Sequence, residues 1–159
     1  MKTGALFAAA TDLSAYISGV TPEVRSAMKD FGMKLGTAYQ IYDDCLDLVG
    51  TEEQFGKTLR TDLEKGKLTL PMLYLLEEAG DTQREILQKR IIQQEELDLT
   101  VLAGIAEYQG AIGKSLAYAT DLLKEARDSL SLVQRSAYRD ALAQMLDFLL
   151  KLLEALQKG

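Results

Sequence analysis

The sequence predicts an all-α protein arranged as an antiparallel helical bundle. Apolar residues recur every three or four positions along most of the chain, and no segment alternates apolar and polar residues as a half-buried strand would. Only 2 of the 159 residues are proline, and 47% are apolar, which is typical of a folded globular chain. We therefore expect a single all-helical domain over residues 1–159.

Two helices are predicted before the first long loop. Helical spacing of apolar residues covers 3–17, and Gly19 then interrupts the pattern. Thr21 offers a capping hydroxyl and Pro22 suits a first helical turn, so a second helix should begin there. The apolar positions of this second helix continue to about Val49, which makes it the longest in the prediction.

Four residues of the long helix carry structural expectations. Gly32 and Gly36 are four positions apart and so share a face, which would admit a closely packed neighbour. Tyr39 and Tyr42 follow the apolar spacing. We expect both tyrosines to belong to the core and not to stack on a substrate.

A loop over residues 50–68 separates the long helix from the later ones. It has no helical period, and long irregular stretches in helical domains are often functional. The last predicted helix has two adjacent apolar stripes, so we expect it to lie between several neighbours or at a subunit contact. After the loop, one helix is expected to begin at Pro71, and Asp81 and Asp98 are expected to cap the next two. Two further helices are expected to run through 116–130 and 136–157.

Composition excludes several function classes. The 24 acidic and 18 basic residues give a net charge of −6 without a dense basic cluster, so we expect no nucleic-acid partner. Histidine is absent, which removes histidine-based nucleophile systems and histidine-ligated zinc. The single cysteine, Cys45, fits a reducing compartment, and we expect a cytoplasmic protein. No run approaches the ~20 apolar residues of a transmembrane segment.

An acidic edge lies near the end of the long helix. Asp43, Asp44 and Asp47 stand at i, i+1 and i+4, and Gln40 precedes them by one helical turn. The carboxylates repel one another, and they lie near the negative end of the helix dipole among apolar neighbours. One interpretation is a solvated acidic edge balanced by water and counterions.

The following loop favours a second interpretation. Lys57, Lys65 and Lys67 lie in it together with Gly56 and Gly66, so ammonium groups and backbone amides can approach the carboxylates. Carboxylates hold Mg²⁺ through one or two contacts plus substrate phosphate oxygens. Carboxylates, a cationic glycine-containing loop and the absence of histidine together indicate a diphosphate bridged by Mg²⁺.

These residues resemble a known family, the trans-isoprenyl (polyprenyl) diphosphate synthases. The similarity to their second aspartate-rich region rests on Gln40-Ile41-Tyr42-Asp43-Asp44-Cys45-Leu46-Asp47-Leu48, Gly56-Lys57-Thr58 and Thr61-Asp62-Leu63-Glu64-Lys65-Gly66-Lys67-Leu68-Thr69-Leu70-Pro71. The opening Lys2-Thr3 resembles the lysine-threonine pair of the same family. The resemblance implies that residues 1–159 form a half-domain, the C-terminal half of the isoprenoid synthase fold.

The resemblance also implies a role for each matching residue. In the family reaction an allylic diphosphate ionises, the double bond of isopentenyl diphosphate attacks the cation, and a proton is lost. The implied assignments are Mg²⁺ binding by Asp43, Asp44 and Asp47, neutralisation of the diphosphate by Lys2, Lys57 and Lys67, hydrogen bonding near the reacting carbons by Thr3 and Gln40, and a catalytic set of Lys2, Thr3, Gln40 and Lys57.

Two departures from the family pattern shape the functional prediction. Family members carry a first aspartate-rich motif on an earlier helix, and this sequence has only one Asp-Asp-x-x-Asp. Arg60 stands where the pattern usually has glycine. We therefore expect a half-site that is inactive alone and that forms a homo-oligomer or joins a complementary N-terminal half. The alternative is a non-catalytic helical subunit that modulates another prenyl synthase chain.

Overall fold

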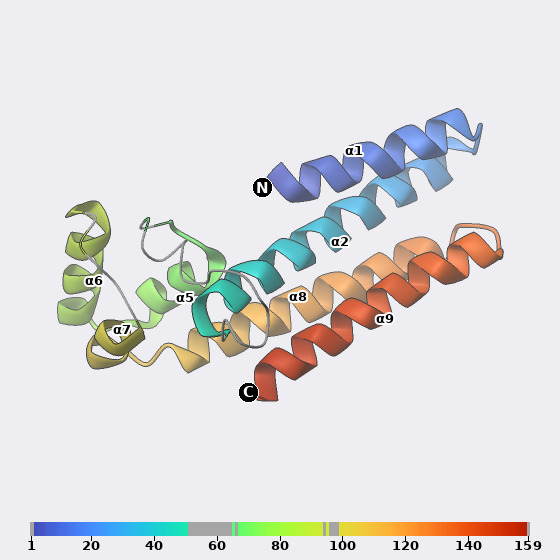
Figure 1. The fold of residues 1–159 in the computed structure, drawn as a ribbon. Coiled ribbons are helices and arrows are strands. Elements are labelled where there is room, and N and C mark those ends of the chain that lie inside the picture. Colours follow the sequence, from blue (N-terminus) through green and yellow to red (C-terminus); the bar gives the residue numbers. More distant parts are fainter. Residues whose placement is uncertain (1, 51–64, 66, 94, 96–98, 159) are drawn as a thin grey trace. The chain divides into compact units, whose positions relative to one another are not determined.

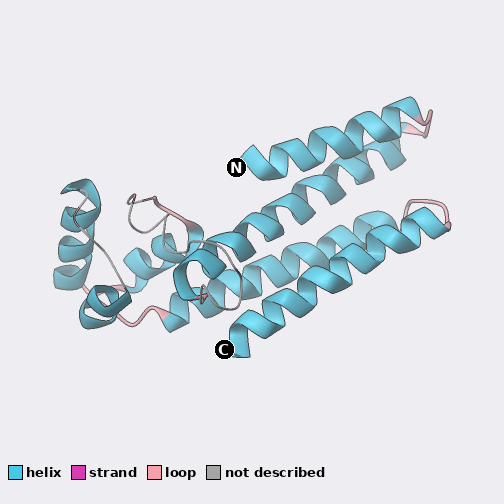
Figure 2. Ribbon diagram, in the orientation of Figure 1, coloured by secondary structure: helices cyan, strands magenta, loops and turns pink. Residues whose placement is uncertain are grey.

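A computed structural model describes residues 2–50, 65, 67–93, 95 and 99–158, and in these residues it contains α-helices and no strand (Figures 1 and 2). The all-α prediction is therefore confirmed. The helices are α1 (Lys2–Ile17), α2 (Pro22–Val49), α5 (Leu70–Glu78), α6 (Asp81–Gln93), α7 (Leu99–Ile105), α8 (Gln109–Leu130) and α9 (Ala137–Lys158).

The predicted helices agree with the structure apart from details at their ends. The long helix ends at Val49 as expected, and α8 begins earlier than the prediction, so Gly110 lies inside it. Asp81 is the first residue of α6 and not a residue preceding the helix. Most of the predicted loop, and the expected cap Asp98, lie outside the described residues. No described helix is long and apolar enough to cross a membrane.

The chain divides into two compact units, which are described separately. The first contains Met1–Gln40 and Tyr118–Gly159, and the second contains Ile41–Ala117. Helices α2 and α8 each contribute residues to both units. The residues singled out in the sequence therefore fall into two groups, one in each unit.

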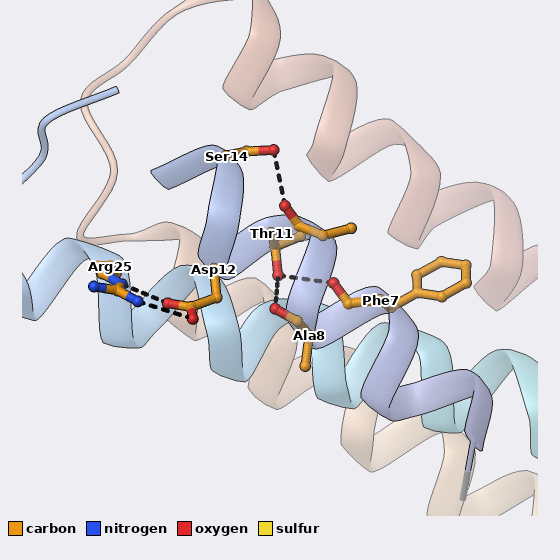
Figure 3. Close-up of polar contacts among 7 residues, drawn as sticks. Phe7, Ala8, Thr11, Asp12, Ser14 and Arg25 are labelled. Atoms are coloured by element: carbon orange, nitrogen blue, oxygen red, sulfur yellow. Dashed lines mark hydrogen bonds and ion pairs between the residues drawn. The ribbon is translucent and has the colours of Figure 1, made fainter. Parts of the chain in front are cut away.

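In the first unit, α1 packs closely against α2 because glycines line the contact. A methyl group added at Gly32 would lie 2.5 Å from the Phe7 carbonyl oxygen, and one at Gly36 would lie 2.9 Å from Phe7 Cβ. The Thr11 hydroxyl donates to the Phe7 carbonyl at 3.0 Å, so it stays paired within α1 (Figure 3). The expectation of a close neighbour at Gly32 and Gly36 is confirmed.

An ion pair holds α1 to the start of α2. Arg25 donates from Nε and Nη2 to the two carboxylate oxygens of Asp12, at 2.6 and 3.1 Å (Figure 3). Its guanidinium lies 4.8 Å from the centre of the Tyr16 ring. The hydrogen bond from Arg25 lowers the pKa of Asp12 below its usual value. The stability from this pair is therefore present at neutral pH and is lost as the pH falls through the lowered pKa.

Helices α8 and α9 form the other half of the first unit (Figure 1). Arg127 of α8 pairs with Asp147 of α9. Lys34 Nζ of α2 lies 3.4 Å from Glu125 Oε2, which joins this hairpin to α2. Most of the stabilisation comes from apolar burial, since the ion pairs are partly exposed. The buried side chains of this unit include Phe31, Leu35, Leu123, Leu130, Leu146, Leu149 and Leu153.

The second unit packs α5, α6 and α7 with the ends of α2 and α8 that belong to it. Arg84 of α6 donates to three carbonyls at the end of α5, those of Leu76, Glu77 and Ala79, at 2.8, 3.1 and 3.0 Å. This satisfies acceptors that a helix end leaves without partners. The buried side chains include Ile41, Leu46, Met72, Leu75, Leu87, Leu102 and Leu116.

Gly36→Ala is expected to destabilise the protein by about 1–3 kcal/mol, because the added methyl group overpacks the α1–α2 contact. Gly113→Ala is the matched control, since an added Cβ at this position in α8 would meet no packing neighbour within 4 Å beyond its own helix backbone and chain neighbours. That substitution should be neutral or should stabilise by up to about 1 kcal/mol. Urea unfolding of both variants measures the difference, and equal stabilities would contradict the close-packing account.

Candidate functional site

Two of the candidate residues meet in the first unit. The Thr3 hydroxyl at the start of α1 donates to Gln40 Oε1 of α2 at 2.6 Å. The close approach at Gly36, where an added methyl group would lie 3.0 Å from Gly4 Cα, allows this short contact. Because Thr3 occupies the amide oxygen, the bond fixes the orientation of the Gln40 side chain. Lys2 is the first residue of α1 and is exposed.

The acidic edge lies in the second unit and is largely buried. The exposed fractions of Asp44 and Asp47 are only 5% and 7%, whereas Asp43 is intermediate. Neighbours on α2, including Tyr42 and Leu46, are buried as the sequence predicted. The interpretation as a solvated acidic edge is therefore wrong for Asp44 and Asp47. Buried carboxylates are costly unless positive charge or hydrogen-bond donors compensate them.

A lysine supplies part of that compensation. Lys67 Nζ lies 3.5 Å from Asp44 Oδ1, although the two residues are 23 positions apart in the sequence. The Lys67 side chain is half exposed, so it can hold the carboxylate and still reach solvent. The backbone N–H of Thr69 donates to the Lys67 carbonyl at 2.9 Å, which forms a turn just before α5. Lys57 and Arg60 lie outside the described residues.

Cys45 lies between the aspartates but is not equipped as a nucleophile. It is fully buried, and this burial raises the pKa of its thiol to about 12, with a further contribution from the charge of Asp44. A hydrogen bond with Ser115 acts in the opposite direction but does not cancel these effects. The thiol is therefore neutral at physiological pH, and thiolate chemistry is not available to it.

The donor atoms of the acidic edge fit Mg²⁺. They are carboxylate oxygens, the ligand type that Mg²⁺ prefers, and Lys67 shows that positive charge is held against Asp44. Within the described ranges, no group of three or more cysteine or carboxylate side chains forms a cage that could hold a metal ion. Mg²⁺ does not need such a cage, because one or two carboxylates with phosphate oxygens suffice.

The first unit also contains an apolar groove that the sequence interpretation missed. Its volume is about 440 Å³. Tyr39 lines the groove, where it is 45% exposed and stacks on Phe7 with ring centroids 6.5 Å apart. The prediction of a core position is therefore wrong for Tyr39, and it is confirmed for Tyr42, which is 7% exposed. The breadth of the apolar face of the last helix was the available signal, since Met145, Leu149 and Leu152 of one of its two stripes line the groove. The groove is lined by Phe7, Leu35, Tyr39, Ala141, Gln144, Met145, Phe148, Leu149 and Leu152.

Comparison with known proteins decides the family. The model of the polyprenyl synthetase family matches residues 1–108, which is more than half of the chain. The chain belongs to the polyprenyl synthetase family. The matched residues include the Lys2-Thr3 pair and the Asp43–Asp47 region, so the resemblance seen in the sequence is confirmed.

The relatives in this family are isoprenyl diphosphate synthases. The chain is 37% identical over 150 residues to the short chain isoprenyl diphosphate synthase of Methanothermobacter thermautotrophicus, covering 94% of this chain and 46% of the relative. It is 34% identical over 153 residues to the geranylfarnesyl diphosphate synthase of Aeropyrum pernix, with shares of 95% and 48%. The chain therefore spans about half the length of these relatives.

Solved structures agree with this assignment. A decaprenyl diphosphate synthase from Rhodobacter capsulatus matches with a TM-score of 0.82 and 28% identity, covering 94% of this chain and 47% of that one. A polyprenyl synthase from Caulobacter crescentus, in complex with calcium and isoprenyl diphosphate, matches with a TM-score of 0.76 and 31% identity, covering 91% and 45%. The fold of this polyprenyl synthetase chain thus corresponds to about half of an isoprenyl synthase.

Proposed function

We propose that this chain forms one half of a trans-isoprenyl diphosphate synthase site, the half that holds an allylic diphosphate through Mg²⁺ for chain elongation with isopentenyl diphosphate. The observation that carries the proposal is the pair of buried aspartates of α2, Asp44 and Asp47, with Lys67 Nζ 3.5 Å from Asp44. Membership in the polyprenyl synthetase family supports the choice of substrate class.

Some residues of the proposed site supply charge, and others fix the orientation of a side chain. When bound, Mg²⁺ supplies positive charge that stabilises the departing diphosphate. Lys67 adds an ammonium beside Asp44, and Thr3 fixes the side chain of Gln40 by its 2.6 Å hydrogen bond. The proposed sets are Asp43, Asp44 and Asp47 for the metal, Lys2, Lys57 and Lys67 for the diphosphate, and Thr3 and Gln40 near the reacting carbons.

Divalent metal use is supported by a relative. The Caulobacter crescentus polyprenyl synthase was crystallised with calcium and isoprenyl diphosphate together. Carboxylate oxygens accept both calcium and magnesium, but the smaller ion keeps more of its water and relies on phosphate oxygens. We infer Mg²⁺ for this chain because its acidic edge offers few carboxylates. A cytoplasmic location accompanies the proposal, supported by a free and buried Cys45.

The second candidate is a non-catalytic helical subunit that modulates another prenyl synthase chain. The observation in its favour is the open apolar groove, whose residues Met145 and Phe148 are 49% and 64% exposed. Diphosphate binding separates the two candidates, because a purely structural subunit needs no metal-dependent affinity for diphosphate.

Isothermal titration calorimetry with inorganic diphosphate tests the proposed function. We expect Mg²⁺ to raise the affinity of the wild-type chain for diphosphate at least about tenfold, since the ion bridges two sets of negative charge. Calcium serves as a second divalent ion in a parallel titration. Equal affinity with and without Mg²⁺ would reject the metal-bridged half-site and favour the structural subunit.

A further inference from the structure

Exposed apolar side chains gather at one end of the first unit. Helix α2 begins in this unit and leaves it after Gln40, whereas α8 enters it at Tyr118 and ends inside it. The ion pair of Lys34 and Glu125 joins these two helix segments. Accordingly, the turn before α2 and the turn after α8 both lie at the end of the unit on the right of Figure 1. We call this end the turn tip, and its exposed apolar residues are Tyr16, Ile17, Val20, Leu132 and Tyr138.

The side chains of the turn tip are in water although they are apolar or aromatic. Ile17 and Tyr138 are 75% and 86% exposed, and Leu132 is 59% exposed. Tyr16 lies 4.8 Å from the Arg25 guanidinium, yet it too is largely exposed. These residues come from two separate segments of the chain, so the fold and not local spacing brings them together. Apolar residues gathered on one exposed surface indicate that another molecule or phase covers them.

The turn tip carries almost no charge, although the chain as a whole is acidic. The net charge of the chain is −6, but Arg135 is the one charged residue within 16–22 and 131–138. Charges of both signs follow behind the tip, including Glu23 of α2 and Arg139 and Asp140 of α9. The turn tip can therefore leave water without burying a carboxylate, and its single charge attracts anions.

This composition fits the surface of a lipid bilayer. Tyrosines are enriched at membrane–water interfaces, where the ring is buried while the hydroxyl stays hydrated, and the tip has two of them, Tyr16 and Tyr138. Arginine binds the phosphate of a lipid head group, and Arg135 is exposed for this contact. The tip consists of helix ends and short turns, and none of its five apolar residues lines the groove of this unit.

We propose that the turn tip docks the protein on the surface of a lipid bilayer, with Ile17, Val20 and Leu132 among the acyl chains and Arg135 at the lipid phosphates. Docking of this kind places apolar side chains in the interface and requires no spanning helix. The inference goes beyond the proposed function and does not depend on it, because no residue of the turn tip belongs to the proposed diphosphate site.

Sedimentation with vesicles of phosphatidylcholine and phosphatidylglycerol tests the proposal. We expect the wild-type chain to bind, and Ile17→Glu and Leu132→Glu each to reduce binding at least about fivefold, because each places a carboxylate in the inserted surface. Leu6→Glu is the matched control, since Leu6 lies on the same helix as Ile17, is 69% exposed and is not part of the turn tip. Circular dichroism verifies that all three variants remain folded.

A tryptophan reporter tests insertion without adding a charge. The chain has no tryptophan, so Ile17→Trp gives a single fluorophore at the turn tip and Leu6→Trp gives one outside it. With vesicles, we expect the emission of Ile17→Trp to shift to shorter wavelength and that of Leu6→Trp to stay unchanged, because only the tip leaves water.

Three outcomes overturn the proposal. In the first, the wild-type chain does not sediment with the vesicles. In the second, Leu6→Glu loses binding as Ile17→Glu does, or the Ile17→Trp emission does not shift. In the third, light scattering without lipid shows a dimer that Ile17→Glu dissociates and Leu6→Glu does not, because a second copy would then cover the turn tip.

Discussion

Asp44→Asn is expected to abolish the effect of Mg²⁺ on diphosphate binding and to lower the affinity measured with Mg²⁺ at least about tenfold, or about 1.4 kcal/mol. Asparagine keeps the shape of the side chain but removes the charge that holds the ion. In the absence of metal, the substitution should not lower the affinity for diphosphate. Removing a negative charge beside a diphosphate relieves repulsion, so metal-free binding should be equal or stronger. Calorimetry in both conditions measures the two effects.

Two variants sharpen this experiment. Lys67→Gln removes the ammonium that lies 3.5 Å from Asp44, so it should weaken diphosphate binding both with and without Mg²⁺. Asp121→Asn is the matched control, because Asp121 is a largely exposed aspartate with a lysine partner, Lys124, at 2.8 Å. An unfolded variant would lose binding in both conditions. Normal metal-dependent binding by Asp44→Asn would remove this carboxylate from the proposed site.

The local structure was largely predictable because helical spacing records which side of a helix is buried. The long helix was predicted to end at about Val49 and does so, and the glycines at Gly32 and Gly36 do meet a close neighbour. The apolar neighbours of the aspartates indicated a partly buried helix. The burial of Asp44 and Asp47 agrees with that pattern.

The remaining features depend on contacts that spacing does not encode. The charges predicted that a lysine approaches the acidic edge, but only the structure shows that Lys67 contacts Asp44 across 23 positions. Tyr39 has the spacing of a core residue, yet it is 45% exposed because the groove beside it is open. Spacing predicts which face of a helix is apolar, whereas burial also requires a partner on that face. Tyr39 therefore resembles Met145 and Phe148, which also line the groove and are exposed.

The isolated chain is expected to show no detectable prenyl transfer from short allylic diphosphates to isopentenyl diphosphate. The resemblance implies that ionisation uses two aspartate motifs, and this sequence contains one, at Asp43–Asp47. Removing a single group that stabilises a developing anion costs about 10²–10³ in rate, so loss of a whole motif should reduce turnover at least about a thousandfold. Diphosphate release and product formation are measured against the intact Methanothermobacter thermautotrophicus relative.

Addition of the relative's complementary half provides the decisive comparison. If the two halves form one site, activity should appear when they are mixed. It should disappear again with Asp44→Asn, because this substitution removes the charge of a buried carboxylate that is proposed to hold Mg²⁺. Turnover by the isolated chain at the rate of the intact relative would show that one aspartate motif suffices, and the half-site account would be wrong.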